Sequence, residues 1–164
     1  MRNVFSLCVQ NVPGVLSHVA GMLAARGYNV DSLTVCAAEN PALSNMTIVL
    51  DVDPRVADQV GSQLQKLVTA VETHNLSRVP HIERELALIR VEVAPSERTG
   101  VVELTNIFRA KIVDVGVNSI IIELTGSQSK LEAFFELTKE YETLELARTG
   151  ITGLSRGSDG VRYL

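Results

Sequence analysis

The stretch Asn11-Val12-Pro13-Gly14-Val15-Leu16 separates a run of residues typical of a β-strand from a run typical of a helix. Residues 4–9 before it are rich in β-branched, aromatic and aliphatic side chains, and the apolar residues after it recur at spacings of three and four. Pro13 fixes its own φ angle and keeps Val12 out of the helical region, while Gly14 can adopt backbone angles that other residues avoid. The stretch is therefore predicted to join a strand to a helix that begins just after Gly14.

The same junction is a candidate site for a small anion. Backbone N–H groups at the start of a helix are free, and the helix dipole favours a carboxylate or a phosphate there. Asn11 can hydrogen-bond the ammonium or the carboxylate group of a ligand, so an amino acid suits the position. A structural interpretation also fits, in which Asn11 closes a turn and Gly14 only relieves backbone strain. The junction alone does not decide between the two.

The rest of the first half completes a β-α-β-β-α-β pattern. Gly27 follows the first helix at the position that prefers the left-handed conformation, and Asp53-Pro54 is a carboxylate N-cap followed by proline at the first helical position. The elements expected after the first helix are strands at about residues 30–38 and 45–51, a helix starting at Pro54, and a strand at about 70–76.

The second half repeats this order. The expected elements are a strand through residues 86–93, a helix carrying Val101, Leu104 and Phe108, a hairpin of residues 112–115 and 119–125, a helix with a Ser129–Glu132 capping box, and a strand at about 143–151. We therefore predict an α+β chain of two tandem ferredoxin-like domains, each an antiparallel sheet with helices on one face. The domains are placed at residues 1–77 and 84–164, with a linker at 78–83 and a mobile C-terminal tail. Each small domain leaves sheet surface or edges open, so an oligomer is expected.

Composition and charge exclude several kinds of partner. The 164 residues carry 15 basic and 19 acidic side chains, a net charge of −4, which argues against nucleic acid or an anionic membrane as the main partner. No apolar stretch approaches the ~20 residues that cross a bilayer, and no signal pattern is recognisable at the start, so a cytoplasmic protein is expected.

The residues that could carry catalysis or bind metal are scattered. The phosphate-binding and nucleophile motifs G-x-x-x-x-G-K-[ST], G-x-S-x-G and G-x-G-x-x-G are absent, so no catalytic residue is assigned. The three histidines and two cysteines lack metal-ligand spacing, and both thiols are expected to be free. Residues 155–160 are rich in glycine and serine but precede no helix, and they are interpreted as tail. We expect no cofactor and no metal on this chain.

The quoted junction resembles the (N/D)-x-P-G-x-L signature of ACT domains, which bind amino acids and regulate metabolic enzymes. Four longer segments are more specific. Residues 26–35, 43–48, 65–68 and 147–157 resemble the regulatory (small) subunit of acetohydroxyacid synthase, also called acetolactate synthase, and they occur in both halves and in the right order. Where members of this family often have Ile-Glu, the chain has Val30-Asp31, a change that bears on the fit of an effector side chain.

This resemblance implies a function and a site. It implies a non-catalytic subunit that activates the catalytic subunit, which converts two pyruvate to 2-acetolactate and CO2 and is expected to carry thiamine diphosphate, Mg and FAD. It also implies feedback inhibition by valine or a related branched-chain amino acid, with the N-terminal domain, residues 1–77, as the ACT domain. The implied effector site lies between the ACT domains of a homodimer and consists of Asn11, Gly14, Val15 and Leu16 from one chain with Asn29 and Val30 from the other.

The expected sheet is consistent with such a dimer. In a ferredoxin-like sheet of order 4-1-3-2 the second strand is an edge, and pairing it with its twin makes a continuous sheet. Three alternatives remain open: a stand-alone ACT sensor that regulates another enzyme, an acylphosphatase-type hydrolase, and a ligand-responsive transcription factor. The hydrolase needs an arginine in the Asn11 loop, which is missing, and the transcription factor is opposed by the acidic balance and by the lack of a helix-turn-helix segment.

Overall fold

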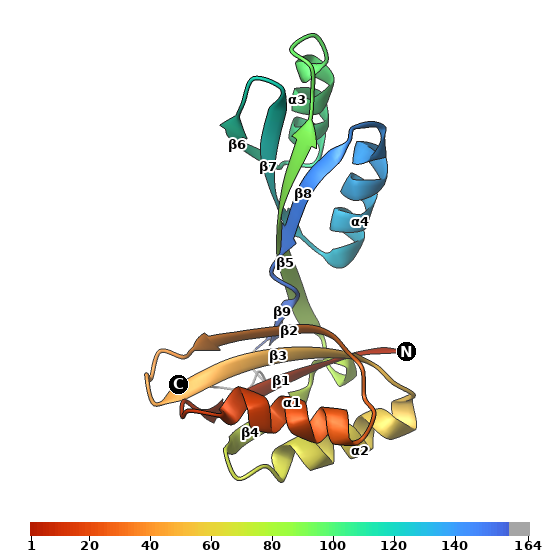
Figure 1. Cartoon of the computed structure of the whole chain (residues 1–164). Helices are drawn as coiled ribbons and strands as arrows, with labels where there is room; N and C mark the ends of the chain where they lie inside the picture. Colours follow the sequence, from red (N-terminus) through yellow and green to blue (C-terminus); the bar gives the residue numbers. More distant parts are fainter. Residues whose placement is uncertain (158–164) are drawn as a thin grey trace. The chain divides into compact units, whose positions relative to one another are not determined.

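A computed structural model describes residues 1–157 of the chain, which form two compact units. The first unit contains residues 1–83 together with the segment that begins at Ile151, and the second contains residues 84–150. Both have helices on one face of an antiparallel sheet (Figure 1). The predicted fold class is therefore confirmed.

The first unit carries the junction. Its elements are β1 (Arg2–Gln10), α1 (Val15–Ala25), β2 (Val30–Ala37), β3 (Leu43–Asp51), α2 (Pro54–Gln65), β4 (Ala70–Asn75) and a 3₁₀ turn at Leu76–Arg78. The sheet order is β2-β3-β1-β4 with antiparallel neighbours, so β2 is an edge strand, as predicted. Asp53 caps α2 by accepting a hydrogen bond from the backbone N–H of Arg55 at 2.9 Å.

The core of the first unit follows from strand alternation and helix periodicity. Every second residue of β1, beginning at Phe5, faces the helices, and so does every second residue of β3 from Met46. The helices cover them with apolar residues spaced three and four apart. The buried helix residues in this core are Val15, Val19, Leu23, Ala57, Val60 and Leu64.

The second unit has the same order of elements. These are β5 (His81–Glu92), which begins in the first unit, α3 (Arg98–Ile107), β6 (Lys111–Val115), β7 (Ser119–Gly126), α4 (Gln128–Leu137), a 3₁₀ turn at Thr138–Glu140 and β8 (Thr143–Arg148). The sheet order is β6-β7-β5-β8. Phe134 is fully buried and meets the ring of Phe108 edge-on at a centroid distance of 5.3 Å.

The structure divides the chain differently from the predicted boundaries near the C-terminus. The last strand of the second unit ends at Arg148 rather than 151, because Gly150 adopts a φ of 81° and turns the chain. Ile151 is then buried in the first unit against Val4, Val49 and Leu76, and β9 (Thr152–Ser155) pairs with β5. This strand was missed because its four residues show no extended alternation.

Two smaller features also differ from the prediction. The predicted linker at 78–83 is instead the end of a 3₁₀ turn followed by the start of β5, so β5 runs without interruption across the boundary at residue 84. Helix α4 is capped by Ser127, whose hydroxyl accepts from the backbone N–H of Lys130 at 3.4 Å, and not by Ser129. The expected mobile tail begins at Ser155, which here is the last residue of β9, and its part from residue 158 on lies outside the described residues.

Candidate functional site

The junction forms a short loop that leaves backbone donors unused at the start of α1. Gly14 is the N-cap, with φ 85° and ψ −5°, and it provides no side chain to cap the helix. Val15 donates its N–H to the carbonyl of Val12 at 3.3 Å, and His18 donates to the carbonyl of Gly14 at 2.9 Å. The N–H groups of Leu16 and Ser17, which lie between them, have no partner among residues 1–157. A Cβ added to Gly14 would meet no atom within 4 Å, so the loop is open at Gly14.

Asn11 holds this loop against a neighbouring turn. Its backbone N–H donates to the carbonyl of Ala42 at 2.8 Å, and its side-chain Nδ2 donates to the carbonyl of Pro41 at 2.9 Å. The structural role considered for Asn11 is therefore present. Its Oδ1 is still available as an acceptor, which suits an ammonium group better than a carboxylate.

The two apolar residues predicted in this half of the site differ in exposure. Val15 is 8% exposed and belongs to the core of the first unit, so its side chain is directed away from a ligand on the surface. Leu16 is 44% exposed, and Val12, four positions earlier in the chain, is 42% exposed. The exposed apolar surface of the loop thus comes from Leu16 and from Val12, a residue that was not assigned to the site, although its place in the turn-forming stretch was a usable signal.

The other predicted half lies at the start of β2. Asn29 is exposed, and its Nδ2 donates to Oδ1 of Asp31 at 3.2 Å. Val30 is 36% exposed. The β2–β3 register shifts between Val30 and Ser32, so Asp31 occupies a bulge. Its carboxylate favours an ammonium group at this end of the strand and disfavours an anion.

A single chain does not bring the two halves together. Strand β1 ends opposite the start of β3, with Gln10 paired to Leu43, whereas Val30 at the start of β2 pairs with Leu50 at the far end of β3. The halves therefore lie at opposite ends of the same sheet (Figure 1). The helix between them has 11 residues and spans about 16 Å. A site containing both halves needs a second copy of the chain.

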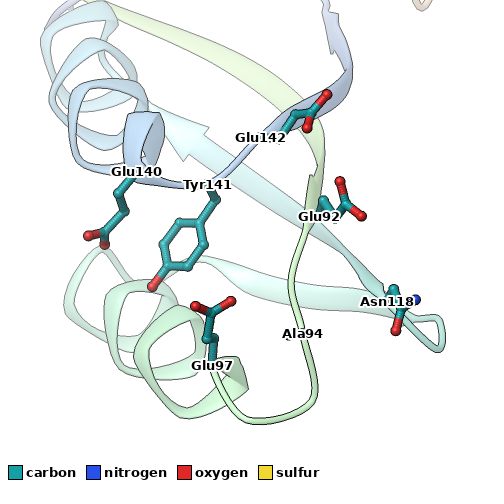
Figure 2. A pocket seen from close by; sticks show the side chains of 7 residues that line it. All are labelled: Glu92, Ala94, Glu97, Asn118, Glu140, Tyr141 and Glu142. Carbon is teal, nitrogen blue, oxygen red and sulfur yellow. The ribbon is translucent and has the colours of Figure 1, made fainter.

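Two cavities elsewhere lack the charges that an amino acid needs. A cavity of about 520 Å³ in the second unit is lined by Glu92, Ala94, Glu97, Asn118, Glu140, Tyr141 and Glu142 (Figure 2). Burial raises the pKa of Tyr141, and the carboxylates of Glu140 and Glu97 raise it further. This lining repels a carboxylate. A second cavity, of about 330 Å³, lies on the first unit and has only uncharged residues in its lining, among them Ser6, Thr34, Asn45 and Thr47.

A metal site requires clustered ligands, and a membrane-spanning helix requires a long apolar segment. Nowhere between residues 1 and 157 do three or more histidine, cysteine or acidic side chains gather in a way that could hold a metal ion. Within the same residues, every helix is too short or too polar to cross a membrane. Cys8 and Cys36 are free thiols, and burial raises the pKa of Cys8, with a smaller contribution from Glu72.

The fold of the first unit and its strand-to-helix loop define an ACT-domain protein. A family model described as the AHAS small subunit-like ACT domain matches residues 5–72. A second model, described as the small subunit of acetolactate synthase, matches residues 84–157.

Full-length relatives identify the family. The chain is 47% identical to a probable acetolactate synthase small subunit of Archaeoglobus fulgidus, over 96% of this chain and 99% of that one. It is 38% identical to the acetolactate synthase isozyme 3 small subunit of Escherichia coli, over 99% of this chain and all of that one. The crystal structure of the small subunit from Thermotoga maritima superposes with a TM-score of 0.89 at 38% identity, covering 96% of this chain and 99% of that one. The chain belongs to the acetolactate synthase small subunit family.

Proposed function

We propose that the chain is the regulatory subunit of an acetolactate synthase. It raises the activity of a catalytic subunit that forms 2-acetolactate and CO2 from two pyruvate, and it makes that subunit sensitive to feedback inhibition by valine. Thiamine diphosphate, Mg and FAD belong to the catalytic subunit, and the pair works in the cytoplasm. Membership of the small-subunit family over the whole chain is the observation that carries this proposal.

The effector site forms in a homodimer joined through β2. Two edge strands related by a two-fold axis pair antiparallel, so the start of one β2 lies beside the end of the other. In each copy β2 ends at Ala37, next to the turn whose Pro41 carbonyl holds Asn11. Asn29 and Val30 of one copy thus approach the junction of the other, which supports a site completed across the interface.

The chemistry of the two halves is complementary to valine. Its carboxylate accepts from the free N–H groups of Leu16 and Ser17 at the positive end of α1. Its ammonium group lies against Oδ1 of Asn11 and the carboxylate of Asp31 from the second copy. The isopropyl group contacts the exposed side chains of Leu16 and Val30. Each charge of the ligand then meets the opposite charge or dipole.

Selectivity among branched-chain amino acids is expected to be graded. One methylene in an apolar pocket changes the binding free energy by about 1–3 kcal/mol, so related branched-chain amino acids are expected to bind as well, with affinities that differ by about 10- to 200-fold. Because the effector contacts both copies, it can favour one dimer geometry over another. A coupling free energy of about 1–3 kcal/mol between the site and the catalytic subunit gives a 5- to 150-fold effect.

Calorimetry and an activity assay test the proposal together. We would titrate the purified chain with valine, leucine, isoleucine and an unrelated amino acid, and then assay a cognate catalytic subunit with and without the chain. Binding of valine, activation, and inhibition by valine are expected. If the chain bound no branched-chain amino acid and left the synthase rate unchanged, the proposal would be wrong. Binding without any effect on the synthase would instead indicate a stand-alone ACT sensor.

A matched pair of variants tests the dimer. Val35 lies on the β2 edge and is 42% exposed, and Val102 on α3 is 38% exposed in the second unit. Val35→Lys places a charge in the proposed interface and is expected to give monomers that no longer bind valine, whereas Val102→Lys retains the dimer. Sedimentation at matched concentrations measures the difference. A Val35→Lys variant that remains dimeric would show that β2 is not the interface.

A further inference from the structure

We propose that Ser32 and Thr34 form a clasp on Ile151. When the effector binds at β2, this clasp transmits the resulting change in β2 to the segment that returns from the second unit. The clasp consists of two hydrogen bonds to one residue. Ser32 Oγ accepts from the backbone N–H of Ile151 at 3.0 Å, and Thr34 Oγ1 donates to the carbonyl of Ile151 at 2.8 Å. This inference rests on the proposed function, because it concerns how the effector signal leaves the first unit.

The clasp satisfies the backbone N–H and carbonyl of Ile151, which lack a partner strand among residues 1–157. Residues 32 and 34 alternate along β2 and therefore point to the same face of the sheet. Ile151 lies in neither β8 nor β9, so its backbone takes part in no strand ladder. Both of its polar backbone groups are instead bound by side chains of the edge strand. These bonds require β2 and Ile151 to keep one relative position.

The side chain of Ile151 also fixes the position of this segment, through apolar contacts with the sheet. It is 4% exposed and packs against Val4, Val49 and Leu76. Val49 is the cross-strand neighbour of both Val4 on β1 and Ser32 on β2. The segment therefore lies on the sheet face opposite the helices, across three adjacent strands. A movement of β2 against β3 must either break the clasp or shift Ile151.

Both sides of the clasp have important neighbours in the sequence. Ser32 follows the effector residues, and Ile151 follows the second unit. Asn29 and Val30 precede Ser32, and only the bulge at Asp31 separates them. A bulge is a place where a strand can change direction, so a ligand that draws Val30 toward a second copy also displaces Ser32. On the other side, Ile151 directly follows Gly150, the last residue of the second unit. Ser32 and Thr34 are thus positioning residues that connect the effector strand to that unit.

Isosteric variants separate this role from effector binding. The double variant Ser32→Ala with Thr34→Val removes both hydrogen bonds and keeps the shape of each side chain nearly unchanged. We would measure valine affinity by calorimetry, the dimer by sedimentation, and the inhibition of the reconstituted holoenzyme. We expect valine affinity to stay within about twofold of the wild-type value and activation without valine to persist, while the maximal inhibition falls by at least half.

Two further variants serve as controls. Thr47→Val removes a hydroxyl from the neighbouring β3 position, directly across from Thr34 and without a bond to Ile151, and it should leave inhibition unchanged. Thr34→Ser keeps the hydroxyl, so a holoenzyme that contains it should be inhibited by valine as strongly as the wild-type holoenzyme. A holoenzyme that contains Thr34→Val alone should be inhibited less. If the double variant folds poorly, these single variants still test whether the clasp transmits the effector signal.

The results distinguish three situations. If the clasp variants are inhibited as fully as the wild type, or lose valine binding and the dimer together with inhibition, the clasp does not transmit the signal. If the wild-type chain itself binds no valine and causes no inhibition, the proposed function fails, and the clasp proposal fails with it. Normal binding combined with reduced inhibition, rescued by Thr34→Ser, supports the clasp.

Discussion

Placing a charge at Gly14 gives a direct test of the anion site. Among residues other than glycine, Asn and Asp tolerate the left-handed φ of 85° best, and a Cβ at this position meets no atom within 4 Å. Gly14→Asn and Gly14→Asp should therefore lower the free energy of unfolding by similar amounts, about 1 kcal/mol each. A carboxylate at the start of α1 recovers part of this cost through the helix dipole, so the Asp variant should unfold no earlier than the Asn variant.

The two variants should differ in valine binding. A new carboxylate about 5 Å from the carboxylate of the bound valine raises the free energy of the complex by about 3 kcal/mol at an effective dielectric constant of 20. Solvent at this exposed loop reduces the effect to about 1.4–2.7 kcal/mol, which corresponds to a roughly 10- to 100-fold loss of affinity. The carboxylate also competes for the free N–H groups of Leu16 and Ser17. The uncharged Asn variant should lose less than tenfold.

Calorimetry with valine, urea unfolding and inhibition of the reconstituted enzyme measure these quantities on the same preparations. Gly14→Asp should raise the valine concentration needed for feedback inhibition by the same factor of roughly 10- to 100-fold, while activation persists. An equal loss of affinity in both variants would show that charge is not the cause. Wild-type affinity in Gly14→Asp would place the carboxylate elsewhere and refute the reasoning.

Three further predictions concern stability. Arg148→Ala should destabilise the chain by about 3 kcal/mol in urea unfolding, because it removes a two-pronged ion pair at 2.7 and 2.8 Å and leaves Glu85 as a buried unpaired carboxylate; a loss below 1 kcal/mol would contradict this. Phe134→Ala should cost about 3–5 kcal/mol, whereas Leu137→Ala, at a residue that is 52% exposed on the same helix, should cost under 1 kcal/mol. Partial burial alone raises the pKa of Glu83, but hydrogen bonds from the Arg2 and His81 side chains lower it below the ordinary 4.5. The stabilisation from this carboxylate is therefore complete above about pH 4.5 and is lost as the pH falls through the lower folded-state pKa, and Arg2→Ala should reduce this acid dependence in thermal unfolding between pH 3 and pH 6.

Local signals predicted most of the fold correctly because they act over short distances. Pro13 and Gly14 determine where α1 begins, and Asp53 with Pro54 determines where α2 begins, through φ angles and caps that depend on one or two residues. The choice of which residues of β1 and β3 face the helices follows from the pleat of a strand in the same way. The repeat of this order in both halves then indicated two ferredoxin-like units.

The same reasoning failed where a residue's partner is distant in the sequence. Ile151 looked like the end of a strand, yet it joins the first unit through contacts with residues more than 70 positions away. Val15 belongs to the signature of the predicted site, but the packing of α1 on the sheet buries its side chain. Asp31 was noted only as a departure from a family pattern; its contact with Asn29 is local, but the bulge that it occupies arises from the pairing of β2 with β3.

The sequence by itself therefore determined the two units, the order of their elements, the strand-to-helix junction and the family to which the chain belongs. The units, the elements and the junction follow from backbone preferences and periodicity, which are encoded within a few residues of each position, whereas the family follows from the resemblance of longer segments. Only the tertiary structure decided that the two halves of the predicted site lie at opposite ends of the first sheet, and that β2 is clasped to Ile151. The pairing of strands that are distant in the sequence and the partners of their side chains arise from the simultaneous packing of those segments, so no local pattern by itself specifies them.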